Sequence, residues 1–124
     1  EKDLITKASK AKLHIIPLSN YCIAPLDDNI FANCKSDLKF YEAGLVKTPT
    51  IASPTFAFKK AIKSGETGFL ARPGEWYDTL CRLYQDSDFR KSIAENAYDY
   101  CVKTYAPEKC LAEIEEAYDS FIKN

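Results

Sequence analysis

KSDLKFYEAGLVKTPTIAS, residues 35–53, decides the fold of this chain of 124 residues. Ser36 and Asp37 are both good N-cap residues, and apolar side chains recur after them at helical spacing. Pro49 cannot continue a helix, and the residues after it predict a buried strand at 50–53. A helix followed at once by a buried strand is typical of an α/β sheet.

Two short apolar runs precede this unit, Leu13–Leu18 and Tyr21–Leu26. Both are predicted as buried strands, and helical spacing predicts a helix at 3–12. Only Ser19 and Asn20 separate the two runs, whereas neighbouring parallel strands need a crossover of about a dozen residues or more. The runs therefore form a hairpin, or a connecting piece lies outside this chain.

The sequence after residue 53 predicts three short elements and then helices. Residues 56–63 read as a helix, 64–68 as a turn whose glycines allow positive φ, and 69–71 as a last strand. Beyond them the period is helical, and Pro107 suits a first helical position. The stripes expected in the core are Trp76, Leu80 and Leu83 with Tyr77, Cys81 and Tyr84; Phe89, Ile93, Ala97, Tyr100 and Cys101; and Cys110, Leu111, Ile114, Tyr118 and Phe121.

We therefore expect one domain, residues 1–124, with an α/β part at 1–72 and a helical tail at 73–124. The predicted fold class is α/β: a Rossmann-like, partial parallel sheet followed by C-terminal helices that pack on or beside it. The first βα units of such a domain are expected to lie outside this chain. A chain of this length closes one modest core but not two facing domains.

Charge is unevenly spread along the chain, although the net charge is only -1. Residues 1–72 carry 11 Lys/Arg against 7 Asp/Glu, and residues 73–124 carry 6 against 11. The basic first part could receive a phosphate-bearing ligand, or the two parts are simply two differently solvated surfaces, and the charge pattern alone favours neither interpretation. The overall balance does not indicate a nucleic-acid or membrane-surface binder. No apolar run approaches the roughly 20 residues of a membrane span.

The cysteines and the histidine are predicted to be structural. There are five cysteines, with no C-x-x-C pair and no zinc-type spacing, so they are interpreted as reduced thiols of a cytosolic protein, mostly in the core. They are Cys22, Cys34, Cys81, Cys101 and Cys110. The single histidine, His14, lies in an apolar run and is not expected to be catalytic.

The start of the helix predicted after Lys35 is the candidate binding site. Free backbone N–H groups at a helix start, together with Lys35 and Lys39, can bind an anion such as a nucleotide phosphate. Glu42, three residues after Lys39, can accept two hydrogen bonds from a diol such as ribose. Alternatively Lys39 and Glu42 form a surface pair and Ser36 or Asp37 only caps the helix, and residue types alone favour this second interpretation. Asp37 would repel an anion unless it turns outward to serve the cap.

The order of motifs resembles that of retaining glycosyltransferases of the GT-B type over residues 21–105. That family shows a strand ending in a Pro-rich loop, a K-x-x-E or E-x7-E segment that opens a helix, a "Pro-Val-Ile-Ala-Ser" strand, and then "Glu-x-Ile-x-x-Gly-x-x-Gly-x-Leu". The corresponding segments here, in the same order, are Ile23–Leu26, Lys39–Gly44, Pro49–Ser53 and Ala61–Leu70.

The resemblance implies the C-terminal, nucleotide-sugar donor-binding domain of a group 1 type enzyme. Such an enzyme transfers a sugar from a nucleoside diphosphate sugar to an acceptor hydroxyl, in polysaccharide or glycoconjugate synthesis, and needs no metal or other cofactor. By resemblance Glu42 holds the donor ribose, and the backbone at the helix start approaches the phosphates. The implied donor-site residues are Glu42, Lys39, Lys35, Ser36, Asp37 and Leu38.

Two residues depart from the family pattern. Cys34 stands eight residues before Glu42, where the first glutamate of E-x7-E belongs, and Lys60 replaces the glutamate before the "Ile-x-x-Gly" element. The role of that first glutamate can therefore not be carried over. We expect the isolated chain to be inactive, because it lacks the acceptor domain and carries no evident general base or nucleophile. Cys34 and Lys60 favour the alternative, a non-catalytic Rossmann-like module whose acidic helices bind a partner.

The resemblance also implies partners and a location. The donor-binding domain would face an N-terminal acceptor domain of the parent chain, to which the last helix would return, and nucleic acid is not expected as a partner. The parent enzyme would be cytoplasmic, and any association with the inner face of the membrane would come through that acceptor domain.

Overall fold

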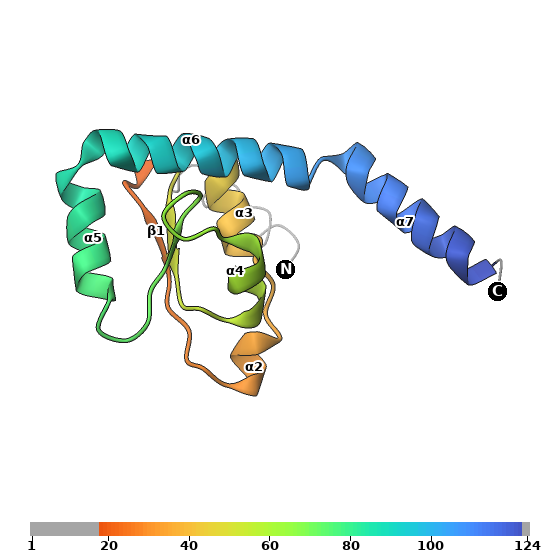
Figure 1. Cartoon of the computed structure of the whole chain (residues 1–124), viewed down its shortest axis with the longest axis horizontal. Coiled ribbons are helices and arrows are strands. Elements are labelled where there is room, and N and C mark those ends of the chain that lie inside the picture. The colour runs from red at the N-terminus through yellow and green to blue at the C-terminus, as the bar shows by residue number, and fades with distance from the viewer. Residues whose placement is uncertain (1–17, 123–124) are drawn as a thin grey trace, which may run out of the picture.

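The computed structural model describes residues 18–122 and contains a parallel sheet flanked by helices (Figure 1). The sheet has three strands in the order β1-β2-β3, with β1 at Cys22–Ala24, β2 at Thr50–Ala52 and β3 at Phe69–Leu70. The predicted α/β class is confirmed, although each strand is shorter than predicted. The helix predicted at 3–12, most of the strand predicted at Leu13–Leu18, and His14 lie outside the described residues; Leu18 itself is exposed and is not in a strand.

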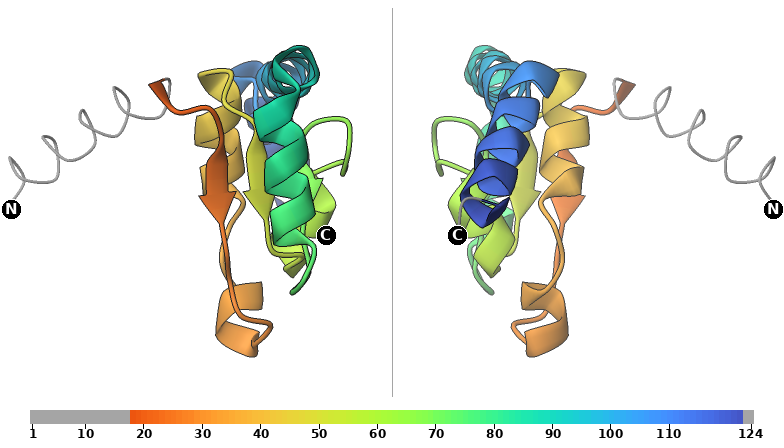
Figure 2. Two further views of the ribbon diagram at one scale, coloured as in Figure 1. Left: turned by 90° about the vertical axis from the view of Figure 1, so that its left-hand side faces the viewer. Right: turned by 90° about the vertical axis from the view of Figure 1, so that its right-hand side faces the viewer.

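Helices connect and cover the strands (Figure 2). The two crossovers between parallel strands contain α2 and α3, and then α4, while α5, α6 and α7 follow β3. Their bounds are α2 Ile30–Asn33, α3 Leu38–Leu45, α4 Phe56–Ala61, α5 Trp76–Gln85, α6 Ser87–Thr104 and α7 Pro107–Ile122. The sequence did not predict α2, which begins because Asn29 Oδ1 accepts a hydrogen bond from Ala32 N at 2.8 Å.

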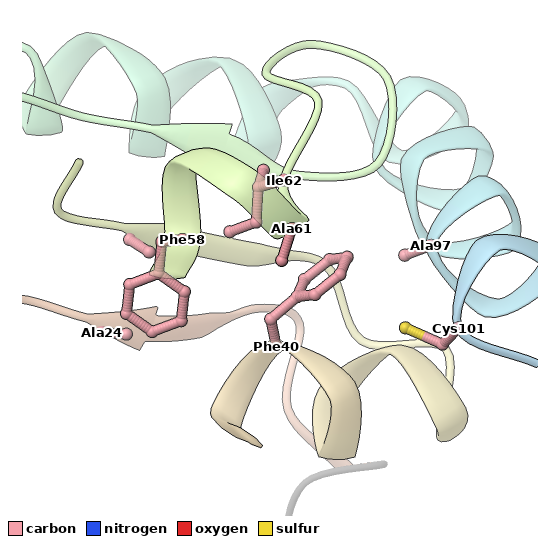
Figure 3. Close-up of a cluster of buried hydrophobic side chains, with 8 residues drawn as sticks. Ala24, Phe40, Phe58, Ala61, Ile62, Ala97 and Cys101 are labelled. Carbon is pink, nitrogen blue, oxygen red and sulfur yellow. The ribbon is translucent and has the colours of Figure 1, made fainter. Parts of the chain in front are cut away.

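Both faces of the central strand β2 are buried, as is usual in a parallel sheet, whereas Ile23 of the edge strand β1 is 50% exposed. Successive residues of β2 point to opposite faces, so that Ala52 joins one hydrophobic cluster and Ile51 the other. The first cluster lies between the sheet and helices α3, α4 and α6 (Figure 3) and contains Ala24, Phe40, Ala52, Phe58, Ala61, Ile62, Ala97 and Cys101. The second lies on the α5 side and contains Ile51, Phe69, Ala71, Leu83 and Ile93.

Helices α3 and α6 approach each other closely at Gly44. A Cβ added there would lie 2.5 Å from Cys101 Sγ and 3.3 Å from the carbonyl oxygen of Ala97. The absence of a side chain at Gly44 therefore sets how closely the two helices pack. A salt bridge of 2.9 Å between Lys47 and Glu95 also joins the end of α3 to α6.

We expect Gly44→Ala to lower the free energy of unfolding by about 1–3 kcal/mol, because the new methyl group overlaps Cys101 Sγ and forces the helices apart. Urea denaturation followed by circular dichroism measures the change. Adding Cys101→Ala to this variant removes the overlapping sulfur, so the double variant should be less destabilised than the two separate losses combined. If the double variant instead loses the sum of the two separate losses, the contact between the new methyl group and Cys101 Sγ is not what destabilises Gly44→Ala.

The two glycines of the turn at 64–68 have different roles. Gly65 has φ 86°, as the turn prediction requires. Gly68 does not have a positive φ, so the predicted role is wrong for it. Its missing side chain matters because a Cβ there would lie 2.9 Å from the carbonyl oxygen of Thr50.

The prediction that all three C-terminal helices pack on or beside the sheet is wrong for α7, in which no residue is buried. This helix projects away from the rest of the domain (Figure 1), and its apolar residues Leu111, Ile114, Tyr118 and Phe121 are 58–85% exposed. Their spacing is that of a buried stripe, but no described element lies opposite. The same spacing misleads in α5, where Tyr77 and Tyr84 are exposed.

The cysteines are also less buried than predicted. Cys101 alone is fully buried, Cys22 and Cys81 are half-buried, and Cys34 and Cys110 are exposed; all five are thiols. A cysteine on an apolar stripe is therefore not a reliable core position here. Within residues 18–122 no helix has both the length and the apolar character needed to cross a membrane.

Candidate functional site

A pocket of about 1000 Å³ lies at the carboxyl ends of the three strands. Ligands of open α/β sheets bind at this edge, because the loops that follow parallel strands converge there. Its walls come from the loop and helix after β1, the loop after β2 with the start of α4, and the loop after β3. The lining residues are Pro25, Leu26, Asp27, Asp28, Asn29, Phe31, Ala32, Lys35, Ser53, Pro54, Thr55, Lys59, Arg72, Pro73 and Trp76.

Hydrogen bonds between the first two loops fix the shape of this pocket. Leu26 N donates to Ser53 Oγ at 2.8 Å, which joins the residues that follow β1 and β2. Asn33 connects α2 to α4, because its Oδ1 accepts from Phe56 N at 2.9 Å while its Nδ2 donates to Asp28 Oδ1 at 3.0 Å. The two walls are therefore held together independently of any ligand.

Three basic side chains line the pocket, each from a different segment: Lys35 after α2, Lys59 in α4 and Arg72 after β3. The Lys35 ammonium lies 4.9 Å from the centroid of the Phe31 ring. Within the described part of the chain no carboxylate lies within 4.0 Å of any of the three charges. Convergent cations without a protein counter-ion favour the binding of an anion such as a phosphate group.

Two carboxylates and an aromatic ring share the pocket with these cations. Asp27 and Asp28 lie in the loop after β1. The partly buried Trp76, at the start of α5, lines the pocket on the side of the loop that follows β3. Carboxylates accept hydrogen bonds from hydroxyl groups, so the pocket can hold a ligand that is both phosphorylated and hydroxylated. Among residues 18–122 no group of three or more His, Cys, Asp or Glu side chains could hold a metal ion.

The structure brings only one of the six predicted donor-site residues to this pocket. Lys35 lines it, whereas the other five do not. Glu42 lies further along α3 and is half-buried, with Oε2 shielded from solvent. The five residues outside the pocket are Ser36, Asp37, Leu38, Lys39 and Glu42.

Asp37 does not serve as the side-chain cap that was one of its predicted roles. It occupies the N-cap position of α3, but its side chain makes no hydrogen bond to the helix. Its carboxylate instead accepts a hydrogen bond from the phenol of Tyr105 at the end of α6. Asp37 therefore accepts a hydrogen bond from Tyr105, far along the chain, in place of one from the backbone of its own helix. Its negative charge is directed toward α6.

The buried thiol of Cys101 and the half-buried phenol of Tyr105, both near Asp37, are not nucleophiles at neutral pH. Burial, together with the nearby Asp37 charge, raises the pKa of Cys101 to about 11. Burial and the hydrogen bond to Asp37 likewise raise the pKa of Tyr105 above its usual value. Both groups are therefore neutral at pH 7, and Cys101 lacks the thiolate that covalent catalysis needs.

The two departures from the family pattern lie in different places. Cys34 is exposed and lines a shallower hollow of about 630 Å³, which shares Asp28, Asn29 and Lys59 with the larger pocket. Lys60 is exposed and lines neither hollow. Its charge is therefore not placed among the three cations of the larger pocket.

Sequence reasoning missed most residues that line this pocket, above all Lys59, Arg72, Asp27 and Asp28. A signal was present, since Asp27, Asp28 and Arg72 closely follow strands that the sequence did predict. Because the carboxyl ends of parallel strands meet at one edge, polar residues after each strand are candidates for one common site.

Comparisons with known proteins agree with this architecture. No protein-family model matches the chain. A D-inositol 3-phosphate glycosyltransferase of Corynebacterium glutamicum is 30% identical over 86 residues, which cover 67% of this chain and 20% of that protein. The C-terminal domain of a glycosyl transferase group 1 family protein from Francisella tularensis has 34% identity and a TM-score of 0.50, over 55% of this chain and 36% of that one.

The extent of these matches limits what they say of the whole protein, because the chain spans about a fifth of the curated relative's length. The two similarities nevertheless point to the same class of protein, one by sequence alone and one by structure as well. The parallel sheet with C-terminal helices is the architecture that this class implies. In sequence and in fold the chain is therefore similar to glycosyltransferases, and its architecture matches the C-terminal, Rossmann-like domain of a GT-B, group 1 type enzyme.

Proposed function

We propose that this domain binds the nucleoside diphosphate sugar from which the parent enzyme transfers a sugar to an acceptor hydroxyl. One observation carries the proposal: Lys35, Lys59 and Arg72 converge from three segments on one pocket at the carboxyl edge of the sheet. A diphosphate is an anion that such a group of cations can bind. The carboxylates of Asp27 and Asp28 are placed to accept hydrogen bonds from sugar hydroxyls in the same pocket.

The same cations would assist the reaction itself. As the bond between the sugar and the diphosphate breaks, negative charge increases on the departing diphosphate oxygen. Donors fixed around that charge stabilise the transition state more than the ground state, and the loss of one such donor in other enzymes costs about 10²–10³ in rate. The domain's part in catalysis is therefore positioning and charge stabilisation.

Glu42 stays a proposed ribose ligand on the strength of the family resemblance. It does not line the pocket, so a bound donor would have to extend from the three cations toward α3 for Glu42 to reach it. The same holds for Lys39 and for the backbone at Ser36 and Leu38, which the resemblance places near the phosphates. The proposal thus separates a diphosphate subsite from a ribose subsite.

Isothermal titration of the chain with UDP, with GDP and with a nucleotide sugar tests this proposal. We expect binding of at least one of these ligands. Glu42→Ala should weaken it at least about tenfold, because a hydrogen bond to a charged group contributes about 1.5–3 kcal/mol. Glu116→Ala, an exposed carboxylate in α7, is the matched control and should leave the affinity unchanged.

Two outcomes argue against parts of this assignment. If Glu42→Ala binds as tightly as the unsubstituted chain, Glu42 is not the ribose ligand. If none of the three ligands binds, the alternative of a non-catalytic interaction module gains support. Besides Cys34 and Lys60, the structure adds one observation in favour of that alternative: the apolar residues of α7 are exposed throughout the described helix.

A further inference from the structure

One hydrogen bond ties the start of α3 to the end of α6. The phenol of Tyr105 donates to Oδ2 of Asp37, and the contact is partly buried. The Tyr105 ring packs on Tyr41, with 4.7 Å between the ring centroids. Tyr41 and Tyr105 both pack against the hydrophobic cluster that contains Cys101. In such apolar surroundings a hydrogen bond is stronger than at the surface, and an unpartnered carboxylate would be costly.

Among residues 18–122, Tyr105 is the one hydrogen-bond partner of the Asp37 side chain. An aspartate at an N-cap commonly accepts a hydrogen bond from its own helix, but the Asp37 side chain does not. Only its backbone carbonyl serves α3, accepting from Phe40 N at 2.9 Å and from Tyr41 N at 3.2 Å. The N-cap residue of α3 is therefore held in place by Tyr105, the C-cap residue of α6.

A short segment joins this contact to the pocket. Lys35, two residues before Asp37, lines the pocket, and its backbone N donates to the carbonyl of Ala32 at 3.2 Å. Residues 35–37 thus run from the wall of the pocket to the hydrogen bond with Tyr105. The position of the Lys35 backbone depends on the anchors at both ends of this segment.

We propose that Tyr105 is a positioning residue for the anion pocket. By holding Asp37, it fixes the segment that carries Lys35 and keeps the Asp37 carboxylate directed toward α6 and away from a bound anion. The inference rests on the proposed function only in taking a diphosphate as the ligand. A phenol is protonated, and so can donate a hydrogen bond, throughout the neutral pH range. Burial and the hydrogen bond to Asp37 raise the pKa of Tyr105 further from that range.

Titration of the 124-residue chain with inorganic pyrophosphate and with UDP measures the effect on the pocket. Tyr105→Phe removes only the hydroxyl group, and we expect it to weaken pyrophosphate binding about threefold to tenfold, the range of one hydrogen bond. Adding Asp37→Asn should restore most of the affinity, because it removes the charge that Tyr105 no longer holds. A purely structural loss would not be reversed by removing that charge.

Tyr100→Phe is the matched control, because it removes a hydroxyl from the same cluster, where the Tyr100 ring packs on Phe40. Amide hydrogen exchange without ligand gives a second readout. Residues 34–39 should exchange faster in Tyr105→Phe but not in Tyr100→Phe, and residues of α5 should be unaffected in both variants.

The two readouts separate the inference from the proposed function. Unchanged affinity in Tyr105→Phe overturns the inference, whether or not exchange is faster, since Tyr105 would then not act on the pocket. Failure of Asp37→Asn to restore affinity overturns the role of the charge. If the unsubstituted chain binds neither pyrophosphate nor UDP, the proposed function fails; faster exchange at residues 34–39 then still supports the positional link, and unchanged exchange overturns it.

Discussion

Replacing Lys59 and Arg72 together by alanine is expected to weaken binding of a nucleoside diphosphate about 100-fold, or about 2.7 kcal/mol. Both side chains line the pocket at the carboxyl edge of the sheet, from different segments, and neither has a carboxylate partner among the described residues. Their removal leaves Lys35 as the one basic side chain of that pocket. Isothermal titration with UDP or GDP at fixed, low salt measures the loss.

The double variant Lys60→Ala, Lys63→Ala is the matched control. It removes the same charge from the same part of the chain, but both lysines are exposed and lie outside the pocket. We expect at most a small loss of affinity for this variant. Equal losses in the two double variants would show that net charge, not the pocket, governs binding. No loss in either variant would place the anion elsewhere.

Phe40→Ala is expected to lower the free energy of unfolding by about 3–5 kcal/mol. Phe40 is fully buried in the cluster between the sheet and helices α3, α4 and α6, where its ring lies close to Ala61 and Ala97 (Figure 3). Both neighbours are small, so they cannot fill the cavity that the missing ring leaves. Natural domains are stable by about 5–15 kcal/mol, and this change therefore removes a large part of the total.

Urea denaturation followed by circular dichroism measures this loss, and Phe121→Ala is its control. Phe121 is 85% exposed in α7, so its removal should change stability by no more than about 0.5 kcal/mol. A similar loss from both variants would contradict the core assignment, because the method would then be measuring an effect of phenylalanine removal in general.

The helix-to-strand unit at residues 35–53 could be predicted because all its signals are local. Asp37 precedes the helix, Pro49 follows it, and β2 begins one residue later. The position of α7 could not be predicted in the same way. Its apolar spacing shows which side chains share a face, but burial depends on an element opposite that face, and the described chain contains none there.

The candidate site shows the same limit. Lys35 was predicted because it lies beside a helix start, whereas Lys59 and Arg72 join it only through the parallel pairing of β1, β2 and β3. The role of Asp37 was misjudged because its residue type indicates a cap, while the fold brings Tyr105 to it from far along the chain. Convergence of distant segments is set by packing, which a single sequence does not display.

The most direct test of the account is to map a bound nucleoside diphosphate onto the chain by amide chemical shifts. Titration of isotope-labelled protein with UDP and with GDP should shift amides in the segments 25–35, 53–59 and 72–76, which contain the residues that line the pocket. Saturating shifts in these three segments with at least one ligand would support a donor site at the carboxyl edge of the sheet. Shifts confined to α7, or none with either ligand, would contradict it.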